Sequence, residues 1–169
     1  ARSLAIGMTN DLNVWVRGAA IEMLGELGDT ASENLIRPHL KSPDRAVRYA
    51  AAGALFKLGD RSELDVLVNG IKGGNSADRY QAIGYLGKIG TIEVVPYLES
   101  LLSGDEDEII FYSLKAIGKN VRKEISSQLI NLTKHRNPSL RYQSILILGE
   151  LGGVSGLERI RSLCSDKDP

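Results

Sequence analysis

The sequence predicts an all-α fold, an α-solenoid built as a right-handed superhelix of about five two-helix repeats of 31 residues. Two observations carry this prediction. First, apolar residues recur every 31 residues without a gap, as in the column Leu24, Leu55, Leu86, Ile117 and Leu148. Second, the apolar residues within each repeat follow helical spacing. Units this short bury their apolar faces only by stacking on one another.

The second helix of each repeat has the clearest pattern. In the first repeat it is predicted over about Val14 to Leu27, with one apolar face made of Val16, Ala20, Met23, Leu24 and Leu27. A glycine follows this segment in three successive repeats and predicts a helix C-cap at Gly28, Gly59 and Gly90.

The first helix of the second repeat is predicted over about Ala31 to Leu40, with Leu35, Ile36 and Leu40 pointing inward. Pro43 is expected to end it, and Asp44 is expected to cap the helix that follows.

The 31-residue spacing divides the chain into five repeats, which we call rows: 1–29, 30–60, 61–91, 92–122 and 123–153. A lone first helix is predicted to follow at 154–169. We expect these rows to form one domain over 1–169. Neither end resembles a polar capping repeat, so the sequence is expected to be a fragment of a longer protein.

Composition limits the classes of function. Lysine plus arginine and aspartate plus glutamate both number 21, and this balance disfavours a dedicated nucleic-acid binder. A single cysteine excludes an internal disulfide. No apolar run approaches the roughly 18 residues of a membrane span. We therefore expect a cytoplasmic protein that does not contact the membrane.

The segments "VRGAAIEMLGELGD" (16–29) and "VRYAAAGALFKLGD" (47–60) resemble HEAT repeats, most closely the short type named after phycobilisome lyases. The resemblance covers nearly the whole chain. It implies first helices on a convex face and second helices on a concave face. It also implies a polar ladder between turn residues and arginines, here Asn13, Asp44, Asn75 and Asn137 with Arg17, Arg48, Arg79 and Arg141. The fourth row departs from this pattern, because Ile110 stands where the arginine is expected.

One residue after the arginines stands an aromatic column, Tyr49, Tyr80, Phe111 and Tyr142. By helical geometry this position lies about 140° from the core face, so it is expected at the flank or exposed. A ridge of aromatic side chains suits a protein or peptide partner. Packing between repeats is the alternative. Gly53 and Gly84, one turn further on, suggest a close approach of either a neighbouring repeat or a ligand.

A second column, Lys57, Lys88 and Lys119, lies near the centre of the predicted exposed face. Together with the aromatic residues it would suit an acidic or phosphorylated segment, or single-stranded nucleic acid. Ordinary solvated lysines are the alternative.

No catalytic, metal-binding or cofactor-binding motif is present: the chain lacks GxxxxGK[ST], HExxH and GxSxG, and Cys164 has no CxxC neighbour. Trp15 is expected to pack.

The sequence therefore favours a non-catalytic interaction scaffold that binds a protein or peptide in its concave groove. Two alternatives remain open: a lyase-type or chaperone-type subunit acting on bilin-carrying proteins, suggested by the resemblance alone, and a nucleic-acid-binding HEAT-like module, which the zero net charge opposes.

Overall fold

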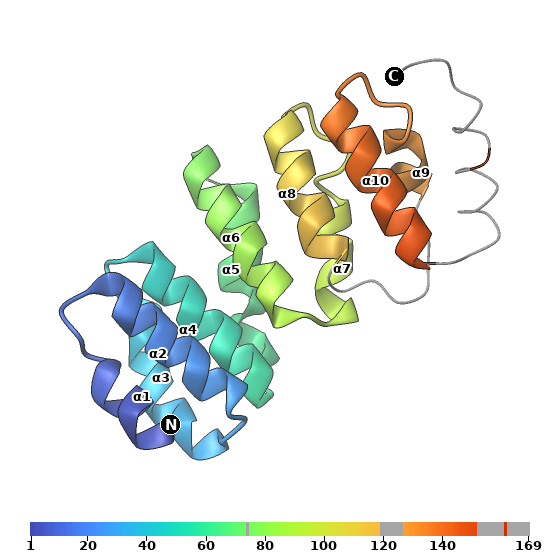
Figure 1. Cartoon of the computed structure of the whole chain (residues 1–169). Coiled ribbons are helices and arrows are strands. Elements are labelled where there is room, and N and C mark those ends of the chain that lie inside the picture. Colours follow the sequence, from blue (N-terminus) through green and yellow to red (C-terminus); the bar gives the residue numbers. More distant parts are fainter. Residues whose placement is uncertain (74, 119–126, 152–160, 162–169) are drawn as a thin grey trace. The chain divides into compact units, whose positions relative to one another are not determined.

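The computed structural model describes residues 1–73, 75–118, 127–151 and 161, and the chain forms two compact units, Ala1–Ile89 and Gly90–Pro169. Each unit is described by itself. In the described residues every regular element is helical, as Figure 1 shows. None of these helices is long and apolar enough to cross a membrane. The predicted lone helix at 154–169 lies almost entirely outside the described residues.

The second helices confirm the predicted 31-residue spacing. In the first unit they are α2 (Val14–Glu26), α4 (Arg45–Leu58) and α6 (Ser76–Ile89). In the second unit they are α8 (Asp107–Gly118) and α10 (Pro138–Leu151). Their first residues, 14, 45, 76, 107 and 138, stand 31 positions apart, so the repeat seen in the sequence is also the repeat of the structure.

The first helices are shorter and less regular. They are α1 (Arg2–Met8), α3 (Glu33–Ile36), α5 (Leu64–Lys72), α7 (Val95–Glu99) and α9 (Ser127–Leu132). Short 3-10 turns lead into three of them: η1 (Thr30–Ser32), η3 (Arg61–Glu63) and η4 (Ile92–Val94).

The continuous helix predicted over Ala31 to Leu40 is wrong. After α3 the chain tightens into the 3-10 segment η2 (Arg37–Lys41). Pro38 explains the change, because proline has no backbone N–H to donate within an α-helix and its ring crowds the preceding turn. In the next repeat α5 contains no proline and runs unbroken for nine residues.

The predicted glycine caps are confirmed. Gly28, Gly59 and Gly90 have φ values of 68°, 108° and 75°, in the left-handed region that glycine adopts without strain. At Gly59 the backbone N–H donates to the carbonyl oxygens of Leu55 and Phe56, which closes the end of α4. These caps end the second helix of each of the first three rows.

The core of the first unit lies between α2 and α4, which run side by side (Figure 1). Ile21 and Leu24 of α2 are fully buried against Val47 and Ala51 of α4. The two helices approach closely at Gly25, where an added β-carbon would lie 2.6 Å from the Ala54 Cα. The glycine is therefore needed for this spacing.

In the first helix of the second repeat, the predicted inward positions are only partly confirmed. Ile36 is fully buried and belongs to the core, and Leu40 packs against it at the edge. Leu35, also predicted to point inward, is exposed. Leu35 and Ile36 are neighbours within α3, where successive side chains point about 100° apart, so the two cannot both face the core directly.

The second unit has a core of its own between α8 and α10. Ile109, Ile110 and Leu114 of α8 are almost completely buried, as are Leu140 and Leu148 of α10. Ile110 occupies the arginine position of the repeat, and here an apolar side chain fills the core at that point.

Candidate functional site

The arginine column has a shared local role at the start of the second helices. Arg17 Nη1 donates to the carbonyl oxygens of Asp11 and Leu12, at 2.7 and 3.1 Å. Arg48 and Arg141 make the same pair of bonds to the carbonyls six and five residues before them. Arg79 donates from Nε to the Ile71 carbonyl. Each guanidinium thus satisfies backbone oxygens near the turn that leads into its own helix.

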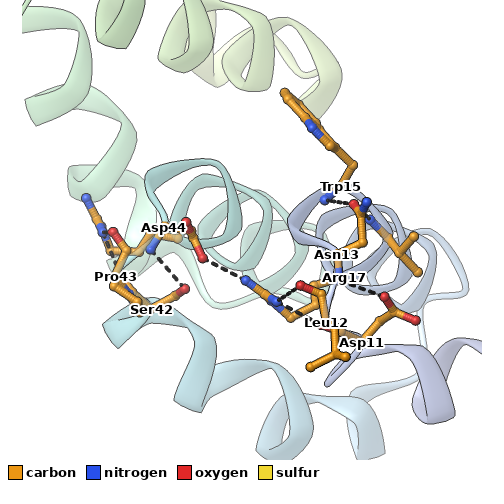
Figure 2. A network of polar contacts seen from close by, with 10 residues as sticks. Asp11, Leu12, Asn13, Trp15, Arg17, Ser42, Pro43 and Asp44 are labelled. Carbon is orange, nitrogen blue, oxygen red and sulfur yellow. Dashed lines mark hydrogen bonds and ion pairs between the residues drawn. The ribbon is translucent and has the colours of Figure 1, made fainter.

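Figure 2 shows how Arg17 also reaches the neighbouring repeat: its Nη2 lies 2.7 Å from Asp44 Oδ2. Asp44 stands at the N-cap position of α4, as predicted, but its side chain makes no capping hydrogen bond. The carboxylate accepts from Arg17 instead, because a charged donor from the adjacent repeat competes for the same oxygen atoms.

Two more polar links join neighbouring second helices near their first turns, and different residues make them. Arg45 of α4 pairs with the nearly buried Asp78 of α6. In the second unit, Asn137 Nδ2 donates to Asp107 Oδ2 at 2.8 Å. Sequence reasoning missed Arg45, Asp78 and Asp107, because none of them lies in the column that the family resemblance indicates.

The asparagines of the expected ladder act as helix N-caps. The Asn13 side-chain oxygen accepts from the backbone N–H of Trp15 and Val16, and Asn75 accepts from Asp78. The Asn137 oxygen accepts from the Ser139 N–H, while its amide nitrogen reaches Asp107. An amide side chain can serve both neighbours because it carries an acceptor and two donors.

The aromatic column divides into different environments. Tyr49 is 5% exposed, Tyr80 and Phe111 are half-buried, and Tyr142 is 64% exposed. The expectation that this position lies outside the core is therefore wrong for Tyr49. The Phe111 ring packs edge-on against Tyr112, with 5.9 Å between the ring centres, and the ammonium group of Lys115 lies over it.

Tyr49 is buried because a first helix makes room for it. A β-carbon added to Gly70 of α5 would collide with the Tyr49 hydroxyl, so the phenol occupies the space that a larger residue would fill. Its ring meets Tyr85 edge-on, with centroids 6.1 Å apart. Burial raises the pKa of the Tyr49 phenol above its ordinary value, although Arg45 and Arg48 act in the opposite direction.

A shallow groove runs over the second helices of the first unit, and Tyr85 lies at its centre. We call it the α2–α4–α6 groove, after the helices that line it. Its floor consists of small residues, namely Gly18, Ala19, Ala46, Ala50, Gly53 and Ala54. Tyr85 lies over this floor: an added β-carbon would lie 3.9 Å from its hydroxyl at Gly18 and 3.9 Å from its ring at Gly53. These distances are ordinary van der Waals contacts, so the neighbouring repeat packs against Gly53 without the close approach predicted there.

The rim of the groove carries charges of both signs in pairs. Lys57 pairs with Glu26, the residue 31 positions earlier, and Lys88 Nζ lies 2.8 and 2.9 Å from the two carboxylate oxygens of Glu22. Lys88 also lies over the Tyr85 ring, 4.6 Å from its centre. Lys57 and Lys88 are therefore balanced by glutamates that stand outside the predicted binding set. Lys119 lies outside the described residues.

Tyr85 connects the floor to the rim. Its burial, together with the neighbouring Glu22 carboxylate to which it is hydrogen-bonded, raises the pKa of the phenol well above its ordinary value. The phenol remains protonated at neutral pH and donates to Glu22. Glu22 thus links Lys88 and Tyr85.

Trp15 stands at one end of the groove, and the expectation that it packs is wrong. Its side chain is 74% exposed and points away from the turn network in Figure 2. An indole this accessible offers a large apolar surface with one hydrogen-bond donor, a common anchor in protein interfaces. Its position on the first turn of α2, which is capped by Asn13, holds it next to the groove.

Within the first unit, nothing lies within 4 Å of the place that a β-carbon on Gly84 would occupy. The close approach expected there, by a further repeat or a ligand, stays a prediction.

The second unit has a separate hollow beside the aromatic column. Phe111 and Tyr112 line it with Asp107, Asn137 and Leu140. Tyr142 is not among the lining residues.

No cluster of three or more histidine, cysteine, aspartate or glutamate side chains that could hold a metal ion occurs in the part of the chain that the structure describes.

Comparisons with known proteins identify the repeat. The model for "HEAT repeats" matches residues 1–78, and the model for "PBS lyase HEAT-like repeat" matches residues 78–104. A search of curated protein sequences gives no significant match.

Solved structures give the same fold at low sequence identity. The complex of CpcE and CpcF of phycocyanin lyase from Nostoc sp. matches with 20% identity and a TM-score of 0.53, over 99% of this chain and 71% of the other. The archaeal HEAT-like repeats protein from Thermococcus onnurineus matches with 16% identity and a TM-score of 0.51, over 99% and 75%. A designed armadillo repeat protein in complex with the peptide (KR)4 matches with 12% identity and a TM-score of 0.53, over 98% and 92%. Such likenesses show an α-solenoid of the HEAT and armadillo type.

Proposed function

Because the chain belongs to the HEAT-repeat family, we propose that it is a binding module that holds a protein or peptide segment in the α2–α4–α6 groove. The observation that carries the proposal is the combination of a floor of glycine and alanine with an exposed tryptophan at its end. At the Trp15 end of the groove the floor residue Ala19 is exposed and accessible to a partner. Trp15 beside it provides the aromatic anchor that such interfaces use.

The paired charges on the rim bear on the chemistry of the partner. Lys57 and Lys88 are already neutralised by Glu26 and Glu22, which weighs against a purely acidic ligand. Lys88 and Glu22 still have exposed side-chain surface, and together they offer donors and acceptors for a polar backbone. We therefore propose an extended segment of mixed charge with an apolar side chain seated on Trp15. Tyr49 is excluded from the binding set, since its ring is buried.

The likeness to a designed armadillo protein in complex with a peptide supports a peptide ligand at the level of the fold. The likeness to a phycocyanin lyase complex keeps a bilin-related role as the alternative, and that role rests on the fold alone. Mixing the chain with a free bilin and recording its absorbance separates the two, because a bilin held in the protein changes its visible spectrum. Nucleic-acid binding would require affinity that falls steeply with salt.

Selection from a displayed library of short random peptides tests the groove. For peptides retained by the wild-type chain, the Trp15→Ala and Lys88→Ala variants are each expected to have an affinity at least about ten-fold lower. Losses of this size are typical of residues that dominate an interface. Leu12→Ala and Lys72→Ala are the matched controls, because both side chains are exposed outside the groove, and they should leave affinity unchanged.

The helix content of all four variants is measured first by circular dichroism. It is expected to equal that of the wild type, because substitutions at exposed positions rarely affect folding. Equal binding of the selected peptides by all four variants would contradict the groove assignment.

A further inference from the structure

The hollow of the second unit lies on the same face of the repeat as the groove of the first unit. It has a volume of about 310 Å³ and is lined by α8 and α10, so we call it the α8–α10 hollow. Five of its lining residues stand three repeats after residues that line the groove: Asp107, Glu108, Phe111, Tyr112 and Ser139 correspond to Val14, Trp15, Gly18, Ala19 and Ala46. In the first unit this face stays open although α4 packs on α2 and α6 on α4. It is therefore a face that the packing of one repeat on the next leaves uncovered.

The chemistry of the α8–α10 hollow differs from that of the groove. Two carboxylates, Asp107 and Glu108, stand on the first turn of α8, where negative charge also complements the helix dipole. One turn later stand two aromatic residues, Phe111 and Tyr112, at positions where the groove has small side chains. Of the five rows, only this one has two carboxylates followed one turn later by two neighbouring aromatic residues. The other rows form the same helices without this combination, so the fold does not require it.

The aromatic rings of the hollow are placed to attract a cation. Within the chain, the ammonium group of Lys115 already lies 5.5 Å from the centre of the Phe111 ring. The Tyr112 ring stands at 78° to the Phe111 ring, and Tyr112 is 45% exposed. Its aromatic surface is therefore accessible to a cation from outside the chain, and such surfaces attract positive charge.

The carboxylates add negative charge beside these rings. Asp107 Oδ2 accepts from Asn137 Nδ2 at 2.8 Å, whereas Asp107 Oδ1 lies 3.9 Å from His135 Nε2, which is too far for a hydrogen bond. An ionised carboxylate can accept at about four positions, so Asp107 has capacity for a further donor. The neighbouring Glu108 is exposed and lines the same hollow. Charge and aromatic surface together are complementary to a flat cation with several N–H donors.

We propose that the α8–α10 hollow binds an arginine side chain of a partner protein. The guanidinium group lies against the Tyr112 ring and donates to the carboxylates of Asp107 and Glu108. A guanidinium can make both contacts at once, because its flat face stacks on aromatic rings while its N–H groups point outward in the plane. The inference does not rest on binding in the α2–α4–α6 groove, since other residues in the other unit carry it.

Addition of an arginine peptide to the isotope-labelled full chain tests the proposal, with amide chemical shifts as the readout. The probe is a short blocked peptide of glycine and serine with one central arginine. The same peptide with citrulline is its matched control, because citrulline has nearly the shape of arginine but no charge. The arginine peptide is expected to shift the signals of Glu108, Phe111 and Tyr112 with a dissociation constant in the millimolar range, and the citrulline peptide should leave them in place.

Three variants at exposed positions locate the binding site. Glu108→Gln removes one charge, and Tyr112→Leu removes the aromatic face but keeps an apolar side chain. Each is expected to weaken binding of the arginine peptide about three- to five-fold, the usual effect of losing one exposed ion pair or cation–π contact. Asp105→Asn is the matched control and should leave the affinity unchanged, because it removes an equal charge from the same acidic run outside the hollow. Helix content should stay constant in all three variants.

Several results would overturn the proposal. The first is an equal shift, or no shift, with the arginine and citrulline peptides, and the second is a lysine peptide that binds as tightly as the arginine peptide. The third is a loss of affinity in Asp105→Asn as large as that in Glu108→Gln. Changes confined to Trp15 and Tyr85 would place the arginine in the groove instead. Calcium ions that shift the same signals as strongly, with no loss in Tyr112→Leu, would show a simple acidic cation site.

Discussion

Replacing Gly25 with alanine is expected to lower the free energy of unfolding by about 1–2 kcal/mol, whereas the same replacement at Gly84 should raise it by up to about 1 kcal/mol. Both glycines lie within second helices, where alanine is intrinsically the better helix former by about 1 kcal/mol. At Gly25 the new β-carbon would lie 2.6 Å from the Ala54 Cα, so α2 and α4 must separate. At Gly84 it meets nothing within 4 Å in the first unit.

Urea unfolding of the two variants, followed by circular dichroism, measures this difference with the same chemical change at both positions. Opposite signs are expected. A Gly25→Ala variant as stable as the wild type would mean that α2 and α4 do not approach as closely as the repeat contact requires.

The Tyr49→Ala variant is expected to lose about 3–5 kcal/mol of unfolding free energy, the usual cost of removing a buried aromatic ring. Tyr142→Ala should change it by no more than about 0.5 kcal/mol. The two tyrosines occupy the same column of the repeat, but one is 5% exposed and the other 64%. Tyr49 fills the space left by Gly70 and packs against Tyr85, while the Tyr142 ring is largely in solvent.

Thermal or chemical denaturation of both variants separates packing from surface roles within one column. A small loss at both positions would show that the column has no packing role at Tyr49. A large loss at both would show that Tyr142 is packed in solution, and it would remove that residue from the set of candidate contact residues.

The second helices could be predicted from the sequence because a single periodicity determines them. A gapless 31-residue grid and helical spacing of apolar residues locate each one, and glycine at Gly28, Gly59 and Gly90 indicates where it ends. The first helices were harder to predict, because Pro38 breaks one of them at a position where the apolar pattern continues.

The groove could be predicted only in part, because its chemistry depends on contacts between repeats. A helical wheel places Lys88 on the exposed face but cannot show that Glu22, 66 residues earlier, neutralises it. The burial of Tyr49 depends in the same way on Gly70 in a different helix. Trp15 was expected to pack because large aromatic side chains usually do, but its side chain is 74% exposed beside a hollow that Leu4 and Met8 also line.

The most direct test of the groove is a map of amide chemical shifts recorded while a selected peptide is added to the labelled chain. The largest changes are expected at Gly18, Gly53, Tyr85 and Lys88, together with the indole N–H of Trp15. Changes confined to the first helices α3 and α5, with the Trp15 indole signal unmoved, would contradict it.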